Sequence, residues 1–217
     1  MVSPLRLLIF GRQGSGKGTQ SSRLAAHYGI PHISTGDMLR AAVASGSDLG
    51  LQVQSIMSDG GLVSDELMEG VVRDRLGEDD AAAGFLLDGY PRTPGQAAYL
   101  EGLLAPAGVT LALNLDVDND VVVDRITRRR VCESCGSTYA LGEPAADSGT
   151  CTKCGGSVVQ REDDTEVAVR KRLSLYEDQT APLLAFFEEK GRLVTVDGVG
   201  DPDDIAVSLI AAIDAGR

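Results

Sequence analysis

The sequence predicts an α/β fold in which a central parallel sheet of five strands is flanked by helices, and two patterns favour it. Short apolar segments alternate along the chain with longer segments of helical composition. This alternation is typical of a parallel sheet that is covered on both faces. The first apolar segment, residues 5–10, also breaks at Gly11 into a glycine-rich loop, which marks a buried strand turning into a helix.

Capping and breaking residues assign the elements in order. Pro31 ends the first helix, a further element begins at Ile33, and Ser64 caps a helix with an acidic first turn. We expect strands over residues 5–10, 85–87, 109–117 and 193–196. We expect helices over residues 19–28, 34–46, 48–57, 65–76, 94–104, 118–130, 165–176, 181–189 and 203–212. Residues 34–63 thus form a small helical insertion, expected between the first two strand segments.

The glycine-rich loop has the spacing of a phosphate-binding loop, G-x-x-x-x-G-K followed by Gly-Thr. Its candidate binding residues are Gly14, Ser15, Gly16, Lys17, Gly18 and Thr19. Glycines let successive N–H groups point into one concavity, and the following helix adds its positive end. We expect Lys17 to reach the outer phosphates and the Thr19 hydroxyl to lie near Mg²⁺. The alternative, a strand-to-helix turn without a ligand, is disfavoured by the complete spacing.

Composition excludes several classes of function. The 217 residues carry a formal charge of −12, which disfavours general nucleic-acid binding, and no apolar run is long enough to span a membrane. We therefore expect a cytoplasmic protein. Arg supplies 16 of the 20 basic residues, with clusters at residues 125–130 and 161–172. Such clusters favour a compact polyanionic ligand, although surface ion pairs would also explain any single Arg.

All four cysteines fall in one segment, with the spacing C-x₂-C-x₁₅-C-x₂-C. They are Cys132, Cys135, Cys151 and Cys154. This spacing indicates a zinc site, and four protein ligands leave no open position, so the ion should be structural. Two disulfides or four free thiols are the alternatives, and thiolates could equally hold Fe or Co.

Taken together, the motifs resemble those of the adenylate kinases. The similarity rests on residues 14–20 (GSGKGTQ), 34–40 (STGDMLR), 88–93 (DGYPRT), 161–164 (REDD) and 169–172 (VRKR), in this order over essentially the whole chain. The cysteine segment is similar to the zinc-bearing lid of the long bacterial form.

The resemblance implies a P-loop nucleoside monophosphate kinase fold that moves the terminal phosphoryl group of Mg·ATP to AMP, giving two ADP. It implies a core domain (residues 1–33, 64–127 and 165–217), an AMP-binding domain (34–63) and a zinc-ribbon-like lid (128–164). It also implies a monomer whose partners are ATP, AMP and ADP, with Mg²⁺ and structural Zn²⁺ as cofactors.

The resemblance also assigns residues to roles. On the ATP side it adds Arg125, Arg129, Thr138, Tyr139 and Gly200 to the phosphate loop. On the AMP side it places Thr35, Arg40, Gly61, Leu62, Val63, Gly89, Tyr90, Pro91, Arg92, Gln96, Arg161 and Arg172. The catalytic set is Lys17, Asp88, Arg92, Arg129, Arg161 and Arg172. Asp88 is the candidate to hold Mg²⁺ through water, with a strand-end cap as its alternative. Asp163 and Asp164 are expected to be lid hinges that pair with arginines.

One residue departs from the family pattern, because Gln13 stands where the family usually has Pro. Losing Pro could loosen the loop, or the Gln side chain could bond within the loop and restore its stiffness.

Two alternatives concern function. One is a different acceptor (UMP, CMP or GMP) or GTP as donor. The other is a nucleotide-gated module whose zinc knuckles contact nucleic acid. The single Lys and absent Arg between Cys132 and Cys154 disfavour the latter.

Overall fold

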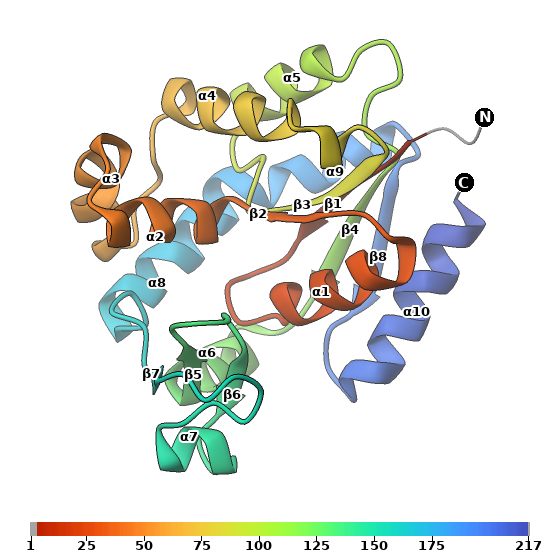
Figure 1. Cartoon of the computed structure of the whole chain (residues 1–217). Coiled ribbons are helices and arrows are strands. Elements are labelled where there is room, and N and C mark those ends of the chain that lie inside the picture. Colours follow the sequence, from red (N-terminus) through yellow and green to blue (C-terminus); the bar gives the residue numbers. More distant parts are fainter. Residues whose placement is uncertain (1–3, 217) are drawn as a thin grey trace.

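The computed structural model describes residues 4–216 and contains a five-stranded parallel sheet of order β2-β3-β1-β4-β8 (Figure 1). Its strands are β1 (Leu5–Phe10), β2 (His32–Ser34), β3 (Gly84–Asp88), β4 (Leu111–Asp116) and β8 (Leu193–Asp197). All four neighbouring pairs are parallel. The predicted α/β class and the five-stranded sheet are therefore confirmed.

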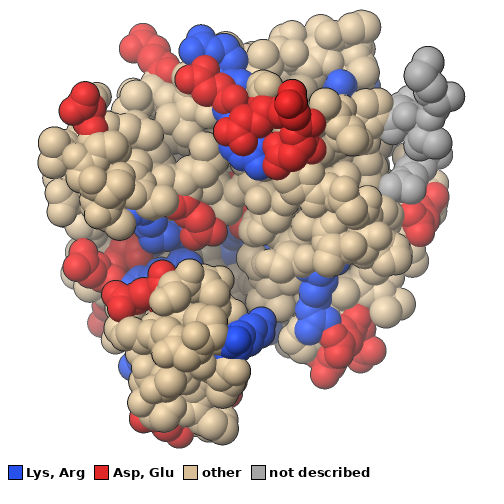
Figure 2. Space-filling model, in the orientation of Figure 1, with Lys and Arg blue, Asp and Glu red and all other residues tan. Residues whose placement is uncertain are grey.

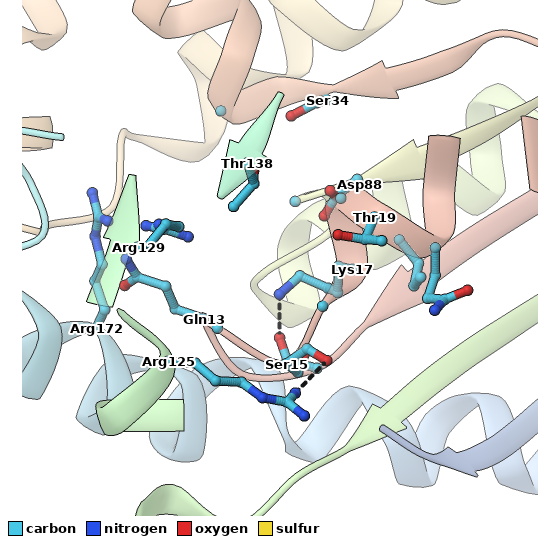
Figure 3. Close-up of a pocket in the computed structure, with 18 of the residues that line it drawn as sticks. Gln13, Ser15, Lys17, Thr19, Ser34, Asp88, Arg125, Arg129, Thr138 and Arg172 are labelled. Carbon is cyan, nitrogen blue, oxygen red and sulfur yellow. Dashed lines mark hydrogen bonds between the residues drawn. The ribbon is translucent and has the colours of Figure 1, made fainter. Parts of the chain in front are cut away.

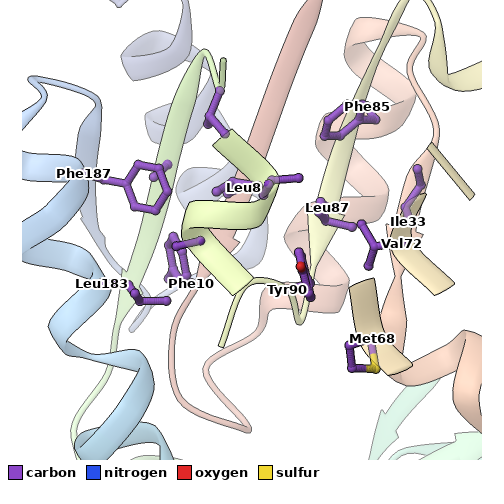
Figure 4. Packing of buried hydrophobic residues seen from close by; sticks show 14 of the residues in the cluster. Leu8, Phe10, Ile33, Met68, Val72, Phe85, Leu87, Tyr90, Leu183 and Phe187 are labelled. Atoms are coloured by element: carbon purple, nitrogen blue, oxygen red, sulfur yellow. The ribbon is translucent and has the colours of Figure 1, made fainter. Parts of the chain in front are cut away.

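Side chains along each strand point alternately to the two faces of the sheet, and helices cover both faces. Leu7 and Ile9 of β1 pack in one cluster with helices α1 (Lys17–Tyr28) and α10 (Pro202–Ala215). Leu8 and Phe10 pack in another, shown in Figure 4. That second cluster includes side chains of α4 (Asp65–Leu76), α5 (Pro94–Leu103) and α9 (Pro182–Glu189). The strand that enters the phosphate loop is thus buried on both sides.

The helical insertion follows β2 and consists of α2 (Thr35–Ser45) and α3 (Asp48–Ser58). Ser34 caps α2 by accepting a hydrogen bond from the Asp37 N–H, as expected. The two helices approach closely at Gly50, where an added Cβ would lie 2.1 Å from the carbonyl oxygen of Ala42. A 3₁₀ turn, Asp79–Ala81, precedes β3.

The lid segment contains a second sheet, antiparallel, of order β6-β5-β7. Its elements are β5 (Arg129–Cys132), β6 (Thr138–Ala140), α7 (Pro144–Ser148) and β7 (Val158–Val159). Its buried cluster contains only Cys132, Tyr139, Ala145, Cys151 and Val158. A core this small does not hold a segment of this length together without a further constraint.

Three expectations about element boundaries need correction. The helix expected to residue 130 is α6 (Asn119–Arg128), because Arg129 turns extended and starts β5. The helical insertion lies between the second and third strands, not between the first and second, because the element that begins near Ile33 is itself a short parallel strand. Finally, α8 (Glu166–Leu175) continues through a π-helical turn, Tyr176–Thr180, towards α9. Among the helices of residues 4–216, none has the length and apolarity needed to cross a membrane.

The packing of α9 on the sheet yields a stability prediction. Phe187 is fully buried and its ring meets those of Phe10 and Phe186. We expect Phe187→Ala to lower the free energy of unfolding by about 3–5 kcal/mol, because the site loses its contacts and keeps a cavity. Equilibrium urea unfolding measures this. The matched control is Val207→Ala on α10, where a side chain 66% exposed should cost less than about 0.5 kcal/mol. A Phe187→Ala cost below about 1 kcal/mol would contradict the packing argument.

Candidate functional site

The described chain contains a large cavity of about 770 Å³ at the carboxyl ends of β1, β2 and β3. Its walls come from the phosphate loop, the helical insertion, the lid segment and α8. Figure 2 shows Lys and Arg side chains gathered in the recess between the lid segment and the rest of the molecule. The carboxyl edge of a parallel sheet is where open α/β folds bind ligands.

The phosphate loop has the backbone that its glycines require. Gly14 and Gly16 have φ values of +84° and +101°, in the region that side chains disfavour. An added Cβ at Gly14 would lie 2.8 Å from Ile126 and 2.9 Å from the carbonyl oxygen of Val122, both on α6. No side chain caps α1 at Gly16, so its first N–H groups remain available to an anion.

Lys17 points across this loop (Figure 3), and its Nζ donates to the carbonyl oxygens of Gly11 (2.7 Å) and Arg12 (2.9 Å). Removal from bulk water lowers the pKa of Lys17 to about 8. Asp88 opposes this shift, whereas the positive charges of Arg92 and Arg129 add to it. The ammonium is therefore held where its charge is poorly compensated, which favours an anionic ligand.

Arginines from several parts of the chain line the same cavity. Those that line it are Arg40, Arg92, Arg125, Arg128, Arg129, Arg161 and Arg172. Burial, and then repulsion by Arg172, lower the pKa of Arg92. Burial, and then repulsion by Arg40 and Arg129, lower the pKa of Arg161 to about 10. Such excess positive charge around one cavity suits a compact polyanion.

Two buried carboxylates hold the arginines in place, as the sequence led us to expect. Asp164 receives a bidentate pair from Arg129, with Nε 2.8 Å from Oδ2 and Nη2 bonded to Oδ1. Asp163 pairs with Arg172, which holds the pKa of Asp163 below its usual value although burial alone would raise it. Planar bidentate pairing fixes the orientation of a guanidinium as well as its position.

A smaller cavity of about 40 Å³ adjoins the first near α4 and α5. Its lining consists of Thr35, Gly61, Leu62, Val63, Met68, Gly89, Arg92 and Gln96. Gln96 is fixed at both ends, since Oε1 accepts from the Arg92 N–H (2.8 Å) and Nε2 donates to Asp65 (2.9 Å). The Thr35 hydroxyl donates to the Asp88 carbonyl oxygen at 3.3 Å. This fixed polar and apolar lining suits a flat heterocycle.

Asp88 ends β3 at the floor of the large cavity, on the same side as Thr19 in Figure 3. Its carboxylate lies 3.6 Å from His32 Nε2 and is mostly removed from solvent. Carboxylate and hydroxyl oxygens are the ligands, directly or through water, that Mg²⁺ prefers. Asp88 and Thr19 therefore fit a magnesium ion carried in with phosphates.

The cysteine cluster lies in the lid segment, outside the large cavity. All four sulfurs are within 4.8 Å of one another, with Cys132 3.5 Å from Cys154 and Cys135 3.6 Å from Cys151. These separations exceed a disulfide bond of about 2.05 Å, and the cysteines are free. Four sulfurs about 2.3 Å from one ion would lie roughly 3.8 Å apart, so the cluster fits a tetrahedral metal.

Every site residue expected from the sequence lines one of the two cavities, apart from the four cysteines. Beside the phosphate loop, Arg125 donates to the carbonyl oxygens of Ser15 (3.4 Å) and Gly198 (3.1 Å). Thr138 and Tyr139 enter from β6. The Tyr139 hydroxyl lies 3.1 Å from the Cys151 sulfur, which joins the cavity wall to the cysteine cluster.

Sequence reasoning missed several lining residues, among them Ser34, Asp37, Met57, Arg128, Glu143 and Tyr176. Asp37 lies in a motif that was singled out and pairs with both Arg40 and Arg161, so its acidic position could have been noticed. Nothing in the local sequence marks Met57 or Tyr176. The suggestion that Gln13 bonds within its loop is also wrong, because its amide donates to Asp164.

Comparison with known proteins agrees with these features. The family model for adenylate kinase matches residues 9–192. The chain is 49% identical to an adenylate kinase of Bacillus licheniformis over 89% of this chain and 91% of that protein. It is 48% identical to one of Bacillus subtilis (93% and 94%) and 46% identical to one of Thermodesulfovibrio yellowstonii (97% and 99%).

The family model spans most of the chain, and each of these relatives matches nearly end to end. The phosphate loop, the arginine-lined cavity and the four-cysteine lid segment are all present in the structure. The chain therefore belongs to the adenylate kinase family of nucleoside monophosphate kinases.

Proposed function

We propose that the reaction of this family, reversible transfer of the terminal phosphoryl group of Mg·ATP to AMP giving two ADP, takes place in the large cavity. The observation that carries this assignment is the loop of residues 11–19, whose Lys17 faces arginines from the helical core and the lid segment across one cavity. Phosphoryl transfer depends on positioning and charge neutralisation, and these residues supply both.

The donor occupies the end formed by the loop and the lid segment. Backbone N–H groups of the loop and the amino end of α1 hold its phosphates, with Lys17 at the outer ones. Arg129 adds charge from the lid segment. The donor base is bordered by four residues that line the same cavity: Arg125, Thr138, Tyr139 and Gly200 through its backbone.

The acceptor occupies the end formed by the helical insertion and the smaller cavity. Residues 61–63, Thr35 and Gln96 enclose its base, where the fixed amide of Gln96 provides polar recognition. Arg40 and Arg92 bind its phosphate. A nucleotide phosphate is already mostly ionised at neutral pH, so the acceptor needs no general base.

Charge at the migrating phosphoryl group is neutralised from several directions. Lys17, Arg92, Arg129, Arg161 and Arg172 surround the space between the two ends. Groups oriented in advance stabilise charge that develops in the transition state without reorganising. Mg²⁺, held near Asp88 and Thr19, would neutralise the phosphate oxygens that the protein cations do not reach.

In this proposal, two of the three parts of the chain move relative to the third. Residues 34–63 and 128–164 close over a core made of residues 1–33, 64–127 and 165–217, excluding water so that ATP is not hydrolysed. Support comes from contacts across the cleft, where Asp37 of the insertion lies 3.9 Å from Arg161 of the lid segment.

The lid segment carries a structural zinc ion in this proposal. Four cysteines leave no open coordination position, and a reducing, cytoplasmic setting would keep them as thiols. The resemblance to the family favours a monomer, and the residues that the proposal requires are all present in a single chain. Size-exclusion chromatography with light scattering checks this state.

The test of function is a turnover assay with Mg·ATP and AMP, compared with UMP, CMP and GMP as acceptors. We expect fast ADP formation with AMP alone. Preference for another monophosphate would keep the mechanism and change the role of Thr35 and Gln96. No transfer to any acceptor would contradict the proposal. A donor panel of ATP and GTP tests the other half of the reaction.

The lowered pKa of Lys17 predicts how donor binding depends on pH. Bound phosphates favour the charged ammonium, so kcat/KM for Mg·ATP should fall as pH rises through about 8, approaching tenfold per pH unit. In Lys17→Arg this fall should disappear, because a guanidinium stays charged.

Initial rates between pH 7 and 9.5 measure this dependence. A flat profile in the wild-type protein would contradict it. Lys17→Ala gives a separate check on the assignment, which fails if the variant loses less than about tenfold in kcat.

Metal removal should loosen the lid segment and leave the rest of the chain folded. The lid segment has only a small buried cluster of its own, so a bound metal would hold it together. We expect Cys151→Ser or chelation to accelerate proteolysis within residues 128–164 and to raise KM for Mg·ATP. Returning zinc should restore the chelated protein. Full activity and unchanged protection in a sample without bound metal would refute the structural role.

A further inference from the structure

We propose that Gln13 is a positioning residue that ties the phosphate loop to the hinge of the lid segment through the buried carboxylate of Asp164. The inference rests on the proposed function in one respect, that the loop binds the donor phosphates. It concerns the residue at which this chain departs from the family pattern.

The tie is a hydrogen bond from Gln13 Nε2 to Asp164 Oδ1 at 3.2 Å, across 151 positions of sequence. The opposite orientation of the amide would set its oxygen against a carboxylate oxygen, so the donor end must face Asp164. The Gln13 oxygen is buried and has no hydrogen-bond partner among residues 4–216. The side chain is therefore held by its donor end.

Asp164 is well placed to carry the connection. Its side chain is 0% exposed, and the same oxygen that accepts from Gln13 also accepts from Arg129. One carboxylate thus joins the loop to an arginine that faces the phosphates. Hydrogen bonds to an ionised acceptor are stronger than neutral ones, and a buried acceptor has no water to replace a lost donor.

Asp164 also ends the lid segment. Its N–H donates to the carbonyl oxygen of Arg161 at 3.1 Å, and its own carbonyl accepts from Gln160 Nε2 at 3.3 Å. Movement of the lid segment away from the core must pivot near these bonds. In Figure 3, Gln13 extends from the loop towards Arg129 and Arg172, on the side of the lid.

The neighbouring residue holds the other side of the loop. Arg12 bonds Glu177 (2.8 Å), Asp116 (3.2 Å) and the Val117 carbonyl oxygen (3.1 Å). The loop is therefore fixed by side chains at two successive positions. A proline at position 13 would limit backbone freedom but could not reach the hinge. In this chain, ordering of the loop is therefore coupled to closure of the lid segment.

Loss of the Gln13–Asp164 hydrogen bond should weaken binding of the donor nucleotide. Without the tie, the lid segment opens more readily before the donor arrives, and binding energy must then close it. KM for Mg·ATP should rise, whereas kcat should be retained or increase because opening for product release is easier. KM for AMP should change much less, because the smaller cavity that encloses the acceptor base has no lining residue from the lid segment.

The experiment compares Gln13→Met, which keeps the length and removes the donor, with Gln160→Met. Gln160 also bonds Asp164 but does not reach the loop, so it is the matched control. We expect Gln13→Met to raise KM for Mg·ATP about tenfold with KM for AMP within about twofold, and Gln160→Met to resemble the wild type. Equal changes in both nucleotides, or no change, would overturn the inference.

Hydrogen exchange of the nucleotide-free protein gives a readout that does not depend on turnover. Amides of residues 161–164 should exchange faster in Gln13→Met than in the wild type, with the β1 and β4 amides unchanged. Inactivity of the wild type would overturn the proposed function and leave this comparison intact. An active wild type with identical exchange in both proteins would overturn the tie alone.

Gln13→Pro separates the tie from simple stiffness of the loop. Proline restores the family residue and removes the donor. We expect it to keep the raised KM for Mg·ATP and the fast exchange of residues 161–164. Wild-type values of both in Gln13→Pro would show that Gln13 acts by stiffening the loop, and would contradict a role at the hinge.

Discussion

The structure depends on keeping several like charges close together around one cavity before any anion arrives. Lys17, Arg92 and Arg161 all have lowered pKa values, because burial, and then repulsion by neighbouring arginines, outweigh the carboxylates nearby. Unpaired charges of this kind destabilise a folded protein. The protein tolerates them because each cation is held by a particular acceptor. The part of the positive charge that these acceptors leave uncompensated can attract phosphates.

The acceptors differ in kind, and the difference matters for function. Lys17 rests on the carbonyl oxygens of Gly11 and Arg12, which a phosphate oxygen can replace without leaving a buried charge alone. Arg129 is instead locked by the carboxylate of Asp164 through two of its nitrogens. Lys17 can thus turn towards a ligand, whereas the guanidinium of Arg129 already has a fixed orientation.

The features that could be predicted from the sequence alone are those that depend on neighbouring residues. Glycine spacing, the Ser34 cap and the cysteine spacing predicted the loop, the start of α2 and the cysteine cluster, because each depends on nearby residues. The end of α6 could not be predicted, since Arg129 leaves the helix to pair with strands that are distant in sequence. The Gln13–Asp164 hydrogen bond joins residues 151 positions apart in the sequence, so no local pattern indicates it.

The passage from α6 into β5 has a consequence for how such proteins can vary. Arg129 lies at the first residue of the lid sheet and Arg161 beyond its last strand, so both leave from the base of that segment. Residues 132–157 hold the four cysteines, and Thr138 and Tyr139 within this range line the cavity. A differently stapled hairpin that keeps these two residues could replace the rest without moving either guanidinium. The way in which the lid segment is stapled can in this sense vary, while the two arginines at its base keep their positions.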